Sequence, residues 1–116
     1  MSDPDCIFCR IVSGDVPADV VHSTDEIVAF RDINPQAPVH VQVIPRRHIT
    51  DASALGAGDG ELLVRMVLAA QHVAASEGIS ERGYRLVFNV GEDAANTIPH
   101  LHLHVLGGRR LGWPPG

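Results

Sequence analysis

Hydrophobic and polar residues alternate in several short stretches of this chain and follow a helical period in one longer stretch. Residues 18–23, 26–32 and 39–45 are short runs rich in valine and isoleucine, separated by turn-forming segments. Residues 84–90 and 100–106 repeat this strand pattern on either side of a polar loop, residues 91–99. Together the five runs predict an antiparallel sheet of about five strands.

The longer stretch runs from Asp59 to about Glu77. Its apolar side chains recur at spacings of three and four, and Gly78 stands where a helix would end. The periodic positions are Leu62, Leu63, Met66, Val67, Ala70, Val73 and Ala74. Strands, one long helix and further strands predict an α+β fold in which the helix packs on one face of the sheet.

Length and charge limit the classes of protein to consider. The chain has 116 residues, of which 45% are hydrophobic, and this suits a single domain spanning residues 1–116. A formal net charge of −5 argues against general affinity for nucleic acid. The sequence contains no lysine, so no lysine adduct can form within it. It also has neither a secretory signal pattern nor a membrane-length apolar run, and we expect a cytoplasmic protein.

The stretch "TIPHLHLHVLGG" places histidine at every second position: His100, His102 and His104. On a strand these three imidazoles would share one face, and the apolar residues between them would face the core. A solvent-facing histidine is unremarkable when it is alone, but three in strict alternation indicate a function. The outer two Cα atoms would lie ~13 Å apart, too far for all three to bind one metal ion, although two neighbours could do so. Different roles for the three histidines fit this pattern better than a shared metal ion does.

A second motif is "CIFC", which contains Cys6 and Cys9. Without a secretory signal the thiols should be reduced, so a structural disulfide is not expected, and no βαβ pattern supports a redox motif. Two readings stay open. The cysteines are buried packing residues, or they supply two of the four ligands of a tetrahedral zinc site.

The sequence "HLHLHVL" resembles the signature of the histidine triad (HIT) superfamily. The segments "AFRDINPQAPVHVQVIPRRHI", "VFNVGEDAANTIPHLHLHVLGGR" and "WPPG" are similar to the Hint branch of that superfamily, so the resemblance covers nearly the whole chain. It implies the HIT-like fold, with a short N-terminal helix added to the sheet and the long helix. It also implies nucleotide hydrolases or transferases that pass a nucleoside monophosphate through a covalent bond to histidine.

The resemblance assigns a role to each histidine of the motif. His102 would be the nucleophile, and the backbone carbonyl of His100 and the side chain of His40 would orient its ring. His104 would be the acid, as an imidazolium that protonates the departing amine. The galactose-1-phosphate uridylyltransferase branch has glutamine at the position of His104. The histidine here therefore resembles the hydrolases of the superfamily and not these transferases. No cofactor is expected in catalysis.

Phe30, Asp32 and Ile33 match the residues that hold the base and the ribose. Two apolar side chains can sandwich a purine, and a carboxylate can accept both ribose hydroxyls. Phe30 and Ile33 could instead belong to the core.

Asn89 and Thr97 match polar residues that contact the phosphate and the leaving group. Nearby the chain departs from the Hint pattern, because Ala95, Asn96 and Thr97 stand where Gly-Gln-Ser is usual. An alanine in a left-handed backbone conformation costs roughly 1–2 kcal/mol, and its methyl group could hinder approach of the phosphate.

Some bacterial triad proteins carry a zinc site, and the resemblance points to His48 and His100 as partners of Cys6 and Cys9. The metal would then be structural. The remaining histidines, His22 and His72, have no partner motif, and we expect surface or packing roles for them.

Hint proteins are dimers, so the resemblance implies a homodimer in which the C-terminal tail, residues 107–116, helps to build the neighbouring site. Trp113, the only tryptophan, would approach the partner's pocket. The helix rows around Leu62, Met66 and Val73 carry more apolar surface than one sheet contact needs, so part of the helix should lie in the interface.

The expected activity is hydrolysis of purine nucleoside phosphoramidates resembling adenosine 5′-monophosphoramidate, through a nucleotidyl-His102 intermediate. The alternative is a nucleotide-binding regulatory protein with vestigial catalysis. A zinc-based nucleic-acid module is disfavoured by the charge. No membrane or nucleic-acid partner is expected.

Overall fold

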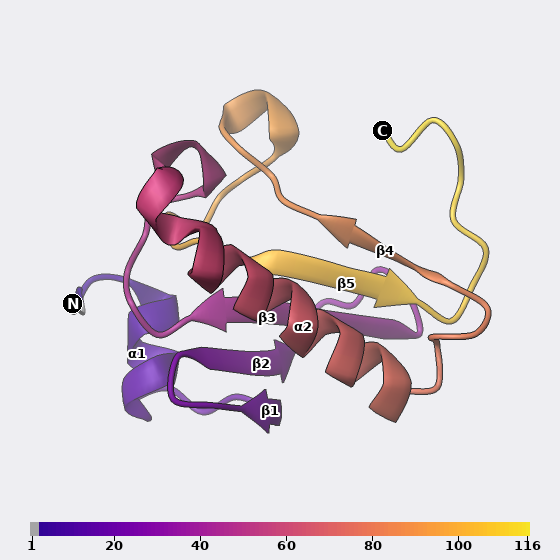
Figure 1. The fold of residues 1–116 in the computed structure, drawn as a ribbon, viewed down its shortest axis with the longest axis horizontal. Coiled ribbons are helices and arrows are strands. Elements are labelled where there is room, and N and C mark those ends of the chain that lie inside the picture. Colours follow the sequence, from indigo (N-terminus) through magenta and orange to yellow (C-terminus); the bar gives the residue numbers. More distant parts are fainter. Residues whose placement is uncertain (1–2) are drawn as a thin grey trace.

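The computed structural model describes residues 3–116, and its centre is a five-stranded antiparallel sheet (Figure 1). The strand order across the sheet is β1-β2-β3-β5-β4. The strands are β1 (Val20–Ser23), β2 (Ile27–Arg31), β3 (Val39–Pro45), β4 (Tyr84–Val87) and β5 (Leu103–Gly107), and the helices are α1 (Ile7–Ser13) and α2 (Gly60–Ser76). The predicted fold class is confirmed, including the long helix and the short N-terminal helix.

Helix α2 lies across one face of the sheet and buries one row of its side chains there (Figure 1). The buried positions are Met66, Ala69, Ala70, Val73 and Ala74. Four of these five are in the predicted periodic set, whereas Leu62, Leu63 and Val67 of that set are only half-buried. The chain leaves the helix through Gly78, whose φ of +77° is a conformation that glycine adopts without a steric penalty.

Strand β3 is buried on both faces because it is the middle strand and both faces are covered. Val41 and Val43 point to the core under α2, and Ile44 belongs to a second cluster on the opposite face. By the same alternation, His40 and Gln42 lie on the face opposite α2. This strand therefore delivers two polar side chains to a largely apolar surface.

Helix α1 covers one end of that opposite face. Its Phe8 and Cys9, together with Cys6 just before it, pack against Phe30 and Ile44 of the sheet. Gly14 ends the helix in a left-handed conformation, with its N–H donating to the carbonyl of Ile11. The space beside α1, on the face away from α2, holds the polar residues of the candidate site.

Strands β1 and β2 are one or two residues shorter at their ends than predicted, and two other strands fall three residues short at one end. β5 begins at Leu103 rather than at residue 100, and β4 ends at Val87 rather than at residue 90. The ladder between β3 and β5 stops at the pair Val43–Leu103, and β3 itself ends at Pro45. Leu101 then donates its N–H to the carbonyl of Ile49 in the loop, so His100 and His102 lie in irregular backbone before the strand.

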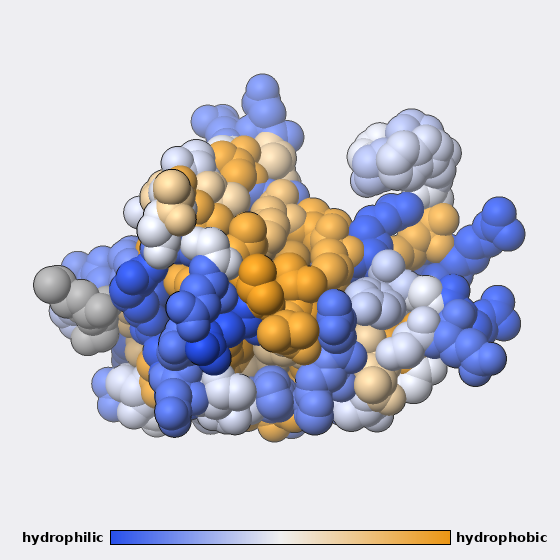
Figure 2. Space-filling model, in the orientation of Figure 1, coloured by the Kyte–Doolittle hydropathy of each residue, from blue (hydrophilic) through white to orange (hydrophobic). Residues whose placement is uncertain are grey.

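Within residues 3–116 no helix is long and apolar enough to cross a lipid bilayer. Met66 and Val73, which we expected to contribute to an interface, are fully buried in the chain's own core. The large apolar side chains that α2 leaves exposed are Val64 and Leu68. Figure 2 shows the apolar surface gathered over the face that α2 covers.

Candidate functional site

His102 is held by the backbone immediately before it. Its Nδ1 lies 2.7 Å from the carbonyl oxygen of His100. Because a carbonyl can only accept, Nδ1 carries the proton, and the neutral ring keeps its lone pair on Nε2. The side chain is 8% exposed, with Phe8 edge-on at a ring-centroid distance of 5.4 Å. His102 thus has one nitrogen fixed as a donor and the other free to attack.

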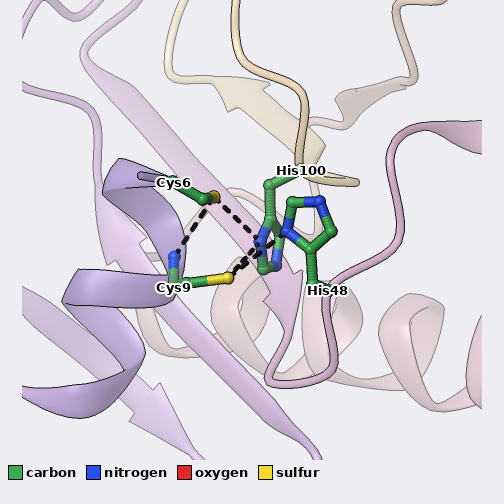
Figure 3. Close-up of side chains that lie close together, drawn as sticks. All are labelled: Cys6, Cys9, His48 and His100. Carbon is green, nitrogen blue, oxygen red and sulfur yellow. Dashed lines mark hydrogen bonds between the residues drawn. The ribbon is translucent and has the colours of Figure 1, made fainter. Parts of the chain in front are cut away.

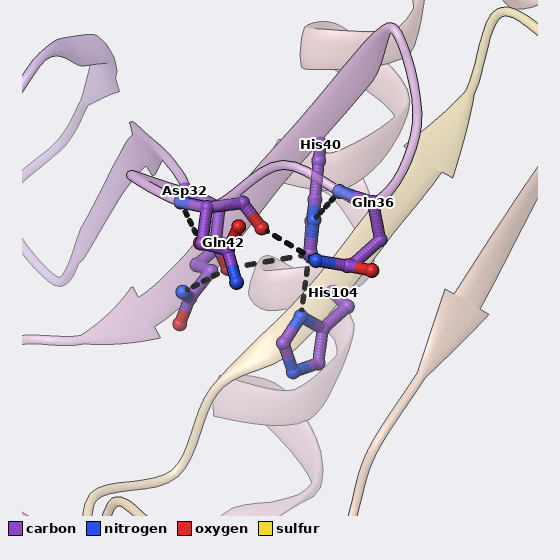
Figure 4. A network of polar contacts seen from close by, with 6 residues as sticks. Asp32, Gln36, His40, Gln42 and His104 are labelled. Atoms are coloured by element: carbon purple, nitrogen blue, oxygen red, sulfur yellow. Dashed lines mark hydrogen bonds and ion pairs between the residues drawn. The ribbon is translucent and has the colours of Figure 1, made fainter.

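His40 and His104 form a directed hydrogen-bonded pair (Figure 4). The backbone N–H of Gln36 donates to His40 Nδ1 over 3.0 Å, so the proton of the neutral His40 ring lies on Nε2. That Nε2 is 2.8 Å from His104 Nδ1 and donates to it. The remaining proton of neutral His104 therefore lies on its Nε2.

This arrangement corrects one part of the expected relay. The carbonyl of His100 orients His102, as predicted, but the side chain of His40 bonds to His104 instead of His102. The sheet register explains the difference. His40 is directly opposite Leu106, and His104 is its diagonal neighbour on the same face of the sheet.

The charge state of His104 also differs from our expectation of an imidazolium. Burial, and secondarily the neighbouring His102 and His40 rings, lowers the pKa of His104 to about 4, against the opposing effect of Asp32. Burial likewise lowers the pKa of His40, against the opposing effect of Asp32. Near pH 7 His40 and His104 are therefore neutral, and His104 offers an N–H donor without a positive charge.

Asp32 and Gln42 complete the polar cluster beside this pair (Figure 4). Asp32 Oδ2 accepts from Gln42 Nε2 over 2.8 Å and lies 3.4 Å from His40 Nε2. Its Oδ1 accepts the backbone N–H of Asn34, which closes the turn after β2. Gln42 Oε1 is buried and has no hydrogen-bond partner. Asp32 is thus fixed in orientation next to the histidine pair.

The expected base-binding residues separate into two environments. Phe30 is buried, and Phe8 packs edge-on against its ring at a centroid distance of 5.3 Å. Ile33 in the following turn is fully exposed. Phe30 therefore has the core role that we left open, and Ile33 does not.

The loop with the departure from the Hint pattern lies on the surface. Ala95 has φ +61° and ψ +30°, the left-handed conformation whose cost the sequence suggested. Together with Asn96 and Thr97 it lines a cleft of about 490 Å³ that also includes Asp51. Asn96 Oδ1 is buried without a partner, and Asn89, after β4, is half-buried. None of the hydrogen bonds within residues 3–116 joins this loop's side chains to the histidines.

Cys6, Cys9, His48 and His100 come together from three distant parts of the chain (Figure 3). Their four candidate ligand atoms all lie within 4.8 Å of one another. His100 Nδ1 is 3.4 Å from Cys6 Sγ and 3.5 Å from Cys9 Sγ, and His48 Nδ1 is 3.3 Å from Cys9 Sγ. Both cysteines are buried and free of a disulfide.

The donor set and its geometry fit a tetrahedral metal ion. Zinc bonds of ~2.3 Å to sulfur and ~2.0–2.1 Å to nitrogen imply sulfur–nitrogen separations of about 3.5 Å. Nε2 of the fully buried His100 lies 2.9 Å from the carbonyl oxygen of Pro45 and donates to it, so Nδ1 faces the sulfurs with its lone pair. Burial raises the pKa of the Cys9 thiol, and a bound cation would reverse this because it ligates the thiolate.

Residues predicted outside the two clusters have other surroundings. Trp113 is 83% exposed, and the tail meets the sheet through the Gly112 carbonyl, which accepts from Arg85 over 2.7 Å. His22 and His72, which had no partner in the sequence, pack against each other with ring centroids 4.2 Å apart. Burial, and secondarily the neighbouring His72, lowers the pKa of His22.

Three residues of the site were missed in the sequence. Gln36 fixes the His40 tautomer, Gln42 holds Asp32, and Phe8 packs against Phe30 and His102. Only Gln42 had a visible signal, because a polar residue between Val41 and Val43 in a buried strand needs a partner. The other two depend on contacts between segments far apart in the sequence.

The chain matches the family model described as the HIT domain over residues 13–111. It is 46% identical over 112 residues to an uncharacterized HIT-like protein of Synechococcus elongatus, and the match covers 97% of each chain. Among solved structures it is similar to a HIT family hydrolase of Legionella pneumophila, with 48% identity, a TM-score of 0.95 and coverage of 97% and 100%. A histidine triad nucleotide-binding protein of Candida albicans aligns with 26% identity, a TM-score of 0.81 and coverage of 95% and 83%.

Proposed function

The chain belongs to the HIT domain family, and on that premise we propose that it is a hydrolase of purine nucleoside phosphoramidates. Catalysis passes through a nucleotide covalently bound to His102. The observation that carries the proposal is the pair of fixed tautomers. A nucleophilic Nε2 on His102 stands beside the donor N–H of His104, with the two ring centroids 4.9 Å apart.

In the first step, His102 Nε2 bonds to the α-phosphorus while the phosphorus–nitrogen bond of the substrate breaks. The departing amine takes a proton from His104. His104 is neutral in the free protein, so the proton that it gives is the one on Nε2, and the hydrogen bond that its Nδ1 accepts from His40 Nε2 stabilises the ring as this proton leaves. In the second step, water attacks the phosphorus and gives a proton to His104. The bond to His102 then breaks and the nucleoside monophosphate is released.

Asp32 and Ile33 support a nucleoside as the substrate. The Asp32 carboxylate is a good acceptor for ribose hydroxyls, and 15% of its side chain is exposed. The fully exposed Ile33 can cover one face of a base with apolar surface. Asn89, Ala95, Asn96 and Thr97 remain candidates for contacts to the phosphate and the leaving group.

Turnover of adenosine 5′-monophosphoramidate by the purified protein tests this proposal. We expect hydrolysis by the wild-type chain and loss of turnover in His102→Ala, with the fold retained. His72→Ala, at an exposed histidine of α2 that packs against His22, is the matched control and should remain active. Near-normal turnover in His102→Ala would refute the nucleophile assignment. Binding of AMP without any turnover in the wild type would favour the regulatory alternative.

We also propose that Cys6, Cys9, His48 and His100 hold one structural zinc ion. The separations of 3.3–3.5 Å between sulfur and nitrogen and the fixed His100 tautomer support it. Four protein ligands leave no position for a substrate, so the ion would tie α1 to the loop before β5 and take no part in the reaction. No cofactor is needed for the proposed chemistry.

We propose, thirdly, that the active unit is a homodimer to which the tail, residues 107–116, contributes. The exposed apolar side chains of Val64 and Leu68 on α2 and of Leu86 on the edge strand β4 support an interface on that side. The exposed indole of Trp113 is the tail's large apolar group and would reach the partner's pocket. Its expected effect is on the choice of leaving group.

A further inference from the structure

Arg109 makes an unusual set of contacts for a surface arginine, since all of its partners are neutral carbonyls. Nε and Nη2 both donate to the carbonyl oxygen of Gln36, over 3.2 and 3.0 Å, and Nη1 donates to the carbonyl of Arg110. None of the ion pairs within residues 3–116 includes Arg109. Its guanidinium therefore binds the backbone of another segment through hydrogen bonds.

That segment is the irregular loop between β2 and β3, residues 32–38, which contains Gln36. The side-chain amide of Gln36 donates to the carbonyl of Asn34 over 3.0 Å, and its backbone N–H donates to His40 Nδ1 over 3.0 Å. The position of Gln36 therefore determines whether His40 keeps its partner on Nδ1.

We propose that Arg109 is a positioning residue that acts through Gln36 and His40 on His104, an inference that rests on the proposed function. Hydrogen bonds run from Arg109 to the Gln36 carbonyl, from the Gln36 N–H to His40 Nδ1, and from His40 Nε2 to His104 Nδ1. Fixing Gln36 fixes the His40 tautomer, which in turn places the proton of His104 on Nε2.

Releasing the loop would permit the opposite arrangement of protons. If the Gln36 N–H moved away, His40 could carry its proton on Nδ1 and present a bare Nε2 to His104. Two bare nitrogens cannot face each other at hydrogen-bonding distance, so the His104 proton would move to Nδ1. His104 Nε2 would then lack the proton that the leaving amine needs.

The backbone beside Arg109 is shaped for this contact. Gly108 has φ +89°, and a Cβ added there would lie 2.9 Å from the Cβ of Pro38, at the end of the same loop. Gly107 pairs with Val39 in the ladder between β5 and β3. The turn after β5 thus packs closely against the loop between β2 and β3. The same segment of the chain carries both His104 and Arg109, the residue proposed to determine which His104 nitrogen is protonated.

Arg109→Ala and Arg109→Lys test the proposal, with Arg82→Ala as the control matched for charge. Arg82 lines the same surface cleft of about 330 Å³ as Arg109, but within residues 3–116 it donates no hydrogen bond to Gln36. We expect Arg109→Ala to lower kcat about tenfold with little change in KM, a fraction of the ~10²–10⁴-fold contribution of general acid catalysis. Arg109→Lys, which keeps the positive charge and one donor nitrogen, should recover part of the lost kcat.

The second readout needs no substrate. Nitrogen-15 spectra of the imidazole rings should show bare Nδ1 atoms on His40 and His104 in the wild type and in Arg82→Ala. In Arg109→Ala both rings should become tautomer mixtures, while thermal unfolding shows that the fold is intact. Spectra and kcat indistinguishable from those of Arg82→Ala would overturn the proposal. If no variant hydrolyses a phosphoramidate, the proposed function fails, and the ring spectra still decide for or against Arg109.

Discussion

Replacing His104 with glutamine should remove a large part of the protein's sensitivity to mild acid. His104 has an ordinary pKa of 6.5 when unfolded and about 4 when folded, because burial disfavours its charged form. The unfolded chain therefore binds the proton more readily, and stability falls as the pH drops below about 6.5 and through about 4. Glutamine fills a similar space, accepts from His40 through its amide oxygen and does not titrate.

The size of the effect follows from the two pKa values. A difference of about 2.5 pKa units corresponds to a limiting value of about 3 kcal/mol at 1.36 kcal/mol per unit. At about pH 5 the unfolded histidine is almost fully protonated and the folded one almost neutral, so about 2 kcal/mol should already be lost relative to about pH 7.5.

The assay is urea unfolding of the wild type and His104→Gln at about pH 7.5 and about pH 5. The wild type should lose about 2 kcal/mol more than the variant between the two conditions. Acid effects on the cysteine cluster and on the histidines that do not contact His104 are common to both proteins and cancel in this difference. His72→Gln, which removes an exposed histidine, should change it by less than about 0.5 kcal/mol. An equal loss in the wild type and His104→Gln would mean that His104 is not held neutral.

Three further outcomes are expected. Ala95→Gly should raise the free energy of unfolding by about 0.5–1 kcal/mol, because glycine adopts the left-handed conformation without strain. Ala94→Gly, in the preceding turn, should lower it. A change of the same sign in both variants would contradict the idea that Ala95 is strained. Protein purified without added zinc or chelator should contain about one zinc ion per chain by elemental analysis, and Cys6→Ser/Cys9→Ser should lose it; metal-free wild type would exclude the site. Deleting residues 113–116 should shift the preference among leaving groups without abolishing hydrolysis, and sedimentation should show dimers; a monomeric wild type or unchanged preferences would exclude the shared site.

The sheet and the long helix could be predicted because their signals are local. The three-and-four spacing around Met66 and Ala70 identifies the buried face of α2 without knowledge of its partner. The alternation around His104 likewise predicts that Leu103 and Val105 face the core, and both are buried there. The start of β5 was not predictable in the same way, because the end of the neighbouring strand at Pro45 decides it.

The candidate site was harder to predict than the fold because its partners are set by register. The sequence identifies His40 and His104 as polar positions, but only the pairing of β3 with β5 makes His104 the partner of His40. The same holds for the charge on His104, since its pKa depends on burial that no local pattern reveals. Gln36 and Arg109 are ordinary surface residues in the sequence and acquire roles only through contacts across the fold.

His100 contributes its side chain and its backbone carbonyl to the site, and a substitution can remove only the side chain. Its imidazole belongs to the cysteine cluster, and its carbonyl holds the ring of His102. A His100→Ala variant loses the imidazole but keeps the backbone carbonyl that accepts from His102. Any loss of turnover would therefore show how strongly the position of that carbonyl depends on the cysteine cluster. By the same logic, a homologue can replace this histidine only if some other contact keeps the carbonyl in place. A relative that lacks histidine at the first position of the motif would therefore have to hold the ring of the proposed nucleophile, His102, by a different contact.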